Sequence, residues 1–145
     1  MNNYGISKLL QSPSALDRIR AERARRHLIE FAEYTFSAYR PASHHRLIAD
    51  ALEDVSSGDC RRLMIFMPPR HGKSELVSVR FPAWYLGRHP DRRIIHASYG
   101  SELSADFGRQ VRNIIGSDEY RAVFPGVELA SDSQRADNWN LAPPH

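Results

Sequence analysis

The residues best suited to chemistry in this sequence are a glycine, a lysine and a serine in a row, Gly72, Lys73 and Ser74. They match the last three positions of the phosphate-loop motif G-x-x-x-x-G-K-[ST]. In such a loop the glycine permits close approach of the backbone, the lysine reaches the β- and γ-phosphates of a nucleoside triphosphate, and the hydroxyl binds Mg²⁺. The first glycine of the motif is absent, because Met67 occupies its position. The sequence therefore predicts a site for ATP and Mg²⁺ in which Ser74 supplies the metal-binding hydroxyl.

The phosphate contacts require more of the loop than these three residues. A loop that closes onto the N-terminus of a helix directs several unpaired backbone N–H groups, and the positive end of the helix dipole, toward one concavity. The residues predicted to bind the nucleotide are Pro69, Arg70, His71, Gly72, Lys73, Ser74 and Glu75. The alternative is a proline-rich turn that carries an incidental lysine.

The segments on either side of the loop have the patterns of strands and helices. Residues 63–67 form a short continuous apolar run, which is typical of a strand buried on both faces of a parallel sheet. A helix is predicted over residues 75–86, although Pro82 should kink or shorten it. A second strand over residues 93–98 and a helix over residues 104–115 complete a β-α-β-α order. This order predicts an α/β fold, namely a partial P-loop NTPase unit of three layers preceded by two N-terminal helices.

The two N-terminal helices are predicted from their caps and from the spacing of their apolar residues. Ser14 and Asp17 form an S-x-x-D cap for a helix that reaches Phe36. A second helix fits residues 43–57 and ends at Gly58. The side chains expected to face the core are Leu16, Ile19, Leu28, Phe31, Ala32, Thr35 and Phe36 in the first helix, and Leu47, Ile48, Ala51, Leu52 and Val55 in the second.

Arginines crowd the middle of the first predicted helix, at positions Arg18, Arg20, Arg23, Arg25 and Arg26. Aspartate and glutamate residues are interspersed, so these arginines are interpreted as a solvated helix face with local ion pairs. A contact with nucleic acid or with a protein partner is the alternative interpretation.

Composition restricts the class of protein. The chain has 145 residues, a net charge of +3 and a single cysteine, Cys60. One cysteine excludes a disulfide framework and a four-cysteine zinc site. No apolar run approaches the roughly 18 residues of a membrane span and no signal peptide is recognisable, so the cytoplasm is the expected location. We divide the chain into a flexible leader at residues 1–13, a helical segment at 14–57, an incomplete P-loop ATPase core at 58–125 and an irregular tail at 126–145.

Several blocks of the sequence, including "MPPRHGKSE" and "FPAWYLGRHPDRRIIHASYGSELSADFGRQVRNII", resemble the N-terminal ATPase part of the large terminase subunit of tailed bacteriophages and prophages. The resemblance covers residues 39–139 and includes "YRPASHH" and "YRAVFPGVEL". It implies a P-loop ATPase of the ASCE type that drives double-stranded phage DNA into a procapsid, in the cytoplasm of the bacterial host. It also implies the portal and the small terminase subunit as partners of the full-length protein, and a homo-oligomeric ring. No membrane partner is expected.

The resemblance also implies roles for individual residues. Terminases tolerate a deviant phosphate loop and commonly carry an arginine inside it, matched here by Arg70. Together with Lys73, this arginine would stabilise the charge that develops on the γ-phosphate during catalysis, as an arginine finger supplied by the same subunit. The alternative for Arg70 is a loop arginine held in solvent.

The family also places the region around "YRPASHH" near the adenine, so the resemblance implies that Tyr39, Arg40 or His45 would stack on the base or bind it. The residues alone favour a simpler interpretation for the histidines. His44 and His45 are adjacent, and neighbouring residues of a helix point to different sides, so ordinary surface histidines are expected.

ATP hydrolysis by this class of protein needs an apolar strand ending in Asp or Glu, which holds Mg²⁺ and activates the attacking water. No such run occurs in this sequence. The chain is therefore expected to be an N-terminal fragment with the triphosphate loop but without the hydrolytic acid or the nuclease domain. The alternatives are a non-catalytic remnant or interaction fragment that binds nucleotide, DNA or terminase subunits, and another P-loop enzyme such as a small-molecule kinase. In each case the two predicted strands lack neighbours, and their exposed apolar edges should favour association.

Overall fold

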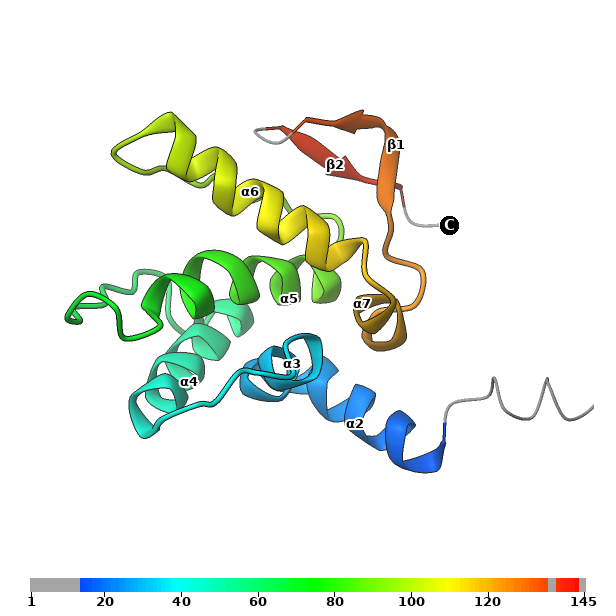
Figure 1. The fold of residues 1–145 in the computed structure, drawn as a ribbon, viewed down its shortest axis with the longest axis horizontal. Coiled ribbons are helices and arrows are strands. Elements are labelled where there is room, and N and C mark those ends of the chain that lie inside the picture. The colour runs from blue at the N-terminus through cyan, green and yellow to red at the C-terminus, as the bar shows by residue number, and fades with distance from the viewer. Residues whose placement is uncertain (1–13, 136–137, 144–145) are drawn as a thin grey trace, which may run out of the picture.

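The chain folds into a set of packed helices with a small sheet at one side (Figure 1). The computed structural model describes residues 14–135 and 138–143. Its elements are helices α2 (Ala15–Arg26), α3 (Leu28–Thr35) and α4 (Ser43–Ser57), the π-helix η1 (Glu75–Arg80), helices α5 (Phe81–Arg88), α6 (Ser101–Ile115) and α7 (Asp118–Val123), and strands β1 (Leu129–Gln134) and β2 (Trp139–Leu141). In Figure 1, α5 lies between α6 on one side and α3 and α4 on the other. None of the described helices is long and apolar enough to cross a membrane.

The predicted three-layer α/β P-loop fold is wrong, because the described chain is mostly helical and its one sheet has two antiparallel strands. Residues 63–67 and 93–98, the two predicted strands, pair with no other strand of the described chain. A strand needs a neighbour for its N–H and C=O groups, and an apolar strand of a parallel sheet needs cover on both faces. Neither is provided here, since Phe66 is 86% exposed and Ile95 is 95% exposed. Apolar character alone therefore does not make these segments strands.

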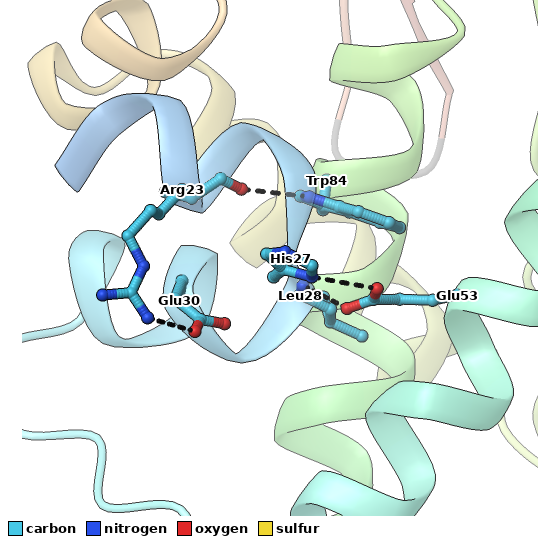
Figure 2. A network of polar contacts seen from close by, with 7 residues as sticks. Arg23, His27, Leu28, Glu30, Glu53 and Trp84 are labelled. Atoms are coloured by element: carbon cyan, nitrogen blue, oxygen red, sulfur yellow. Dashed lines mark hydrogen bonds and ion pairs between the residues drawn. The ribbon is translucent and has the colours of Figure 1, made fainter. Parts of the chain in front are cut away.

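The first predicted helix is interrupted at His27. Its start is confirmed, since the Ser14 hydroxyl accepts the Asp17 N–H at 3.1 Å and the Asp17 carboxylate accepts the Ser14 N–H at 3.2 Å. His27, however, is extended (φ −125°, ψ 132°) and separates α2 from α3. Figure 2 shows the contact that stabilises the break, in which Glu53 of α4 accepts the Leu28 N–H at 2.7 Å. A carboxylate from a distant helix thus caps α3, and a local sequence pattern cannot predict such a cap.

Burial corrects part of the predicted apolar faces of α2 and α4. Leu16 and Ile19 are 55% and 57% exposed, whereas the small residues Ala21 and Ala24 face the core. Leu47 of α4 is 71% exposed. The predicted inward residues that are buried are Leu28, Phe31, Ala32 and Leu52. Both the bounds of α4 and its end at a left-handed glycine, Gly58 (φ 93°), are confirmed.

The arginines of α2 take part in contacts within the chain. Arg23 pairs with Glu30 of α3 at 3.2 Å (Figure 2), and Arg26 pairs with Glu22 at 2.8 Å. Arg25 donates to the Val123 carbonyl of α7 at 2.8 Å. These contacts support the interpretation of the cluster as a helix face with local ion pairs.

One continuous helical stretch follows the predicted phosphate loop, wound first as η1 and then as α5. Pro82 lies within it and does not end it, because the winding changes from π to α between Arg80 and Phe81, and Pro82, which has no N–H to donate, thus stands in the first turn of α5. The buried Arg80 donates to Glu75 at 2.7 Å and to the Thr35 hydroxyl at 2.9 Å. Through its bond to Thr35, Arg80 ties η1 to the end of α3.

Aromatic side chains from α3, α5 and α7 fill the centre of the core. Phe31, Trp84 and Tyr120 are each 0% exposed. The Trp84 indole N–H donates to the Ala24 carbonyl at 3.1 Å (Figure 2), and the Tyr120 hydroxyl donates to the Ala83 carbonyl at 3.1 Å. The polar ends of these two large side chains are therefore satisfied, as burial requires.

The buried Tyr120 should make the fold sensitive to alkali. Burial raises the pKa of Tyr120 above its ordinary value near 10. The folded chain therefore keeps this proton at a pH where the unfolded chain loses it, so the free energy of unfolding should fall as the pH rises above about 10. Tyr120→Phe should be about 1 kcal/mol less stable at neutral pH, because it lacks the bond to Ala83, and should show a smaller alkaline loss. Urea unfolding at about pH 8 and about pH 11 measures both effects, and an equal alkaline loss in the two proteins would contradict the argument.

A β-hairpin lies over α6 where the sequence pattern predicted an irregular tail (Figure 1). Its strands β1 and β2 are antiparallel, and Leu129 faces Leu141. The Trp139 indole N–H donates to the Gly108 carbonyl of α6 at 3.1 Å. The predicted helix over residues 104–115 is confirmed and begins earlier, at Ser101. The hairpin therefore packs on the same core as the helices.

Candidate functional site

The predicted phosphate loop has a backbone of alternating handedness. Arg70 has φ 63° and Gly72 has φ 78°, whereas the φ angles of His71 between them and Lys73 after them are not positive. Such alternation turns successive N–H groups toward one side and forms a concave nest that binds anions. Among the described non-glycine residues, only Arg70 has a positive φ. This conformation is costly for a residue with a Cβ, so it indicates a constrained loop.

The N–H groups of the nest are free to bind a ligand. None of the six backbone N–H groups from Arg70 to Glu75 donates to another group of the described chain. The first that does is the N–H of Leu76, which donates to the Gly72 carbonyl at 3.2 Å. These groups lie where the helical stretch η1–α5 begins, so the positive end of its dipole adds to their attraction for an anion.

The side chains of the loop add positive charge. Arg70 is exposed and Lys73 is half-buried, and neither forms an ion pair with a residue that the structure describes. The Ser74 hydroxyl likewise has no hydrogen-bond partner among the described residues. Glu75, also predicted to bind the nucleotide, is instead held by Arg80 at 2.7 Å. The loop thus presents two unpaired cations and one free hydroxyl, while its single carboxylate is neutralised.

His44 and His45 do not point to different sides of α4, contrary to the sequence prediction. Their ring centroids lie 4.1 Å apart, and both ring Nε2 atoms face the His71 carbonyl oxygen, at 3.4 Å and 2.8 Å. They occupy the first turn of α4, where the His45 ring folds back to accept the Ala42 N–H at 3.0 Å. His45 is also buried, at 9% exposed. Sequence reasoning missed this anchor of the loop, because it joins residues 26 positions apart.

Tyr39 and Arg40, the other residues considered for the adenine, differ in burial and in their contacts within the chain. Tyr39 is buried, and its hydroxyl has no hydrogen-bond partner among the described residues. Burial raises the pKa of Tyr39, and the nearby Glu75 carboxylate raises it further. Arg40 donates to the carbonyls of Ser37 and Tyr39 at 2.8 Å and 2.9 Å. No base-binding residue is therefore assigned.

The protein ligands available for Mg²⁺ are few. Across residues 14–135 and 138–143, no three or more His, Cys, Asp or Glu side chains are grouped so that they could hold a metal ion. Mg²⁺ usually keeps several waters and takes further ligands from substrate phosphates. A single protein hydroxyl, that of Ser74, fits this coordination.

Two hollows of the described chain can be compared with the position of the loop. Two hollows of about 700 and 990 Å³ lie elsewhere, the first between α2, α3 and α4 and the second between α6, the hairpin and residues 90–96. Neither is lined by a residue of the loop. An anion bound at the loop would therefore be held by the nest and by the two flanking cations.

No family model matches this chain, and no curated protein or solved structure matches it either.

Proposed function

We propose that this chain binds the phosphates of ATP, with Mg²⁺, through the loop formed by residues 69–75. The observation that carries the proposal is the run of six free backbone N–H groups from Arg70 to Glu75, on a backbone that alternates in handedness. A concave run of N–H groups at the start of a helix is a phosphate-binding arrangement that requires no particular side chain. It therefore supports the proposal even though Met67 replaces the first glycine of the motif.

The side chains would extend the contact beyond the nest. Lys73 would bind the β- and γ-phosphates, and the Ser74 hydroxyl would bind Mg²⁺. Arg70 would lie beside the γ-phosphate, where a cation compensates the charge of the terminal group. Both cations are free to do this, because neither is paired with another described residue.

We propose binding without turnover by this chain alone. Hydrolysis needs a carboxylate that positions and activates water. Glu75 is the carboxylate of the loop, and the buried Arg80 holds it in an ion pair. This observation favours a nucleotide-binding role over an ATPase or a small-molecule kinase.

For the biological role, we propose that the chain belongs to a large terminase subunit, the motor that packages phage DNA. The support is the resemblance of ordered sequence blocks across residues 39–139. Under this proposal the full-length protein would act on double-stranded DNA with the portal and the small terminase subunit, as a homo-oligomer in the bacterial cytoplasm. The interaction fragment without enzymatic activity is the second candidate, and it is favoured by the exposed apolar side chains Met64, Phe66 and Ile95.

Titration with Mg²⁺ and a fluorescent ATP analogue, with phosphate release followed in the same samples, tests the proposal. Lys73→Ala should bind at least about tenfold more weakly, because it loses a charge-assisted hydrogen bond. Arg61→Ala is the control, since it removes an exposed positive charge outside the loop. Equal affinity of the wild-type protein and Lys73→Ala, or no binding by folded protein, would contradict binding at the loop. Phosphate release that depends on Lys73 would contradict the absence of turnover.

A further inference from the structure

We propose that His45 is a positioning residue for this loop, because it fixes the peptide between His71 and Gly72 so that the Gly72 N–H faces the phosphate. The inference rests on the proposed function, since it concerns the same loop. Its starting point is the contact of 2.8 Å between the His45 Nε2 and the His71 carbonyl oxygen. This contact joins the first turn of α4 to the middle of the loop.

The hydrogen bonds of His45 determine which of its ring nitrogens carries the proton. Its Nδ1 lies 3.0 Å from the backbone nitrogen of Ala42, which can only donate. Nδ1 is therefore the acceptor, and Nε2 of the neutral ring carries the proton. The Nε2–H donates to the His71 carbonyl and holds that oxygen toward α4. The Nε2 of His44 lies 3.1 Å from this Nε2 and 3.4 Å from the same carbonyl oxygen.

The peptide bond transmits this orientation to the other side of the loop. In a planar trans peptide the C=O and N–H groups point in opposite directions. Because His45 holds the oxygen of His71, the N–H of Gly72 points away from α4. Gly72 has φ 78° and no Cβ, so the peptide before it could turn over at little steric cost. In the reversed orientation the loop would present a carbonyl oxygen, with its partial negative charge, in place of a donor.

His45 also fills the space behind Gly72. A Cβ added at Gly72 would lie 2.5 Å from the His45 Nε2. The His45 ring also lies near the buried ring of Tyr39, with a centroid distance of 5.8 Å. Because the ring is itself buried, it has little room to turn its donor away from the His71 carbonyl.

Two substitutions distinguish the effect of the N–H donor of His45 from the effect of its side-chain volume. His45→Phe keeps a ring behind Gly72 but cannot donate to His71. His45→Gln keeps an amide donor, and at the third position of α4 its oxygen can accept the Ala42 N–H, as in a capping box. The matched control is His89→Phe, because His89 is a half-buried histidine that contacts the Ser56 hydroxyl, at 3.3 Å, rather than the loop.

Each protein is titrated with Mg²⁺ and the fluorescent ATP analogue, and NMR spectra of the free proteins record the Gly72 amide and the His45 ring nitrogens. We expect His45→Phe to bind about 10- to 100-fold more weakly, while His45→Gln stays within about threefold of wild type and His89→Phe is unchanged. In the free protein, His45→Phe should shift the Gly72 amide resonance, and the wild-type His45 ring should be protonated at Nε2.

The outcomes distinguish this inference from the proposed function. Lys73-dependent binding that is unchanged in His45→Phe would overturn the inference alone, as would a wild-type ring protonated at Nδ1. Absence of binding by the wild-type protein would overturn the proposed function, and with it the role of His45 in ligand binding. The ring tautomer and the Gly72 shift would then decide whether His45 orients the peptide.

Discussion

Gly72→Ala is expected to weaken binding of the ATP analogue by about 100-fold while leaving the helical fold intact. An alanine at this position would have to adopt a left-handed backbone (φ 78°), and its Cβ would lie 2.5 Å from the His45 Nε2. A strained backbone of this kind costs about 1–3 kcal/mol, and relief of the strain requires that the loop or the His45 ring move. Either movement misaligns the N–H groups that bind the phosphates. The measurement is the same titration, accompanied by circular dichroism to verify the helix content.

Gly58→Ala is the matched control for this experiment. Gly58 also has a left-handed backbone (φ 93°), but nothing lies within 4 Å of a Cβ there, and it ends α4 rather than forming part of the loop. We therefore expect Gly58→Ala to reduce stability by about 1 kcal/mol and to leave the affinity unchanged. Equal losses of affinity in the two variants would show that the effect of Gly72→Ala is one of general destabilisation.

Trp84→Ala should have the largest effect on stability, with a loss of about 3–5 kcal/mol in the free energy of unfolding. The side chain is 0% exposed and its indole N–H donates to the Ala24 carbonyl (Figure 2). Truncation therefore leaves a cavity and removes this hydrogen bond. Small domains have about 5–15 kcal/mol of stability in total, so the variant should be close to unfolding. Urea unfolding followed by circular dichroism measures the change.

Trp139→Ala provides the comparison for the core substitution. Trp139 also donates to a backbone carbonyl, that of Gly108 at 3.1 Å, but it is half-buried and belongs to the hairpin. Trp139→Ala should therefore lower the free energy of unfolding by less than Trp84→Ala does. A larger loss at Trp139 than at Trp84 would contradict the placement of the core between α3, α5 and α7.

The helices were predictable because their determinants are local. Ser14 and Asp17 form the cap of α2, and Gly58 ends α4, as their residue types predict. The loop sequence similarly predicted where a nest would form. The two strands predicted from apolar runs are wrong, since a strand depends on a neighbouring strand that the apolar run itself does not specify. Residues 63–67 and 93–98 have the composition of strands but no partner in the described chain.

The remaining differences between prediction and structure arise from contacts between distant residues. The break at His27 is stabilised by Glu53, which lies 25 positions from the Leu28 that it caps. The His45 ring reaches His71 across 26 positions, so the adjacent histidines gave no indication that they would hold the loop. Both contacts join residues far apart in the sequence, which a local pattern does not specify.

The most direct test of the central claim follows the backbone amide resonances of the loop by NMR as ATP and Mg²⁺ are added. We expect the amides from Arg70 to Glu75 to shift together and to saturate at one ligand concentration, because their free N–H groups would surround one anion. The same addition to Lys73→Ala should produce much smaller shifts at that concentration. If the loop amides stay unchanged, or if the largest shifts fall on the arginines of α2, the loop is not the phosphate-binding site.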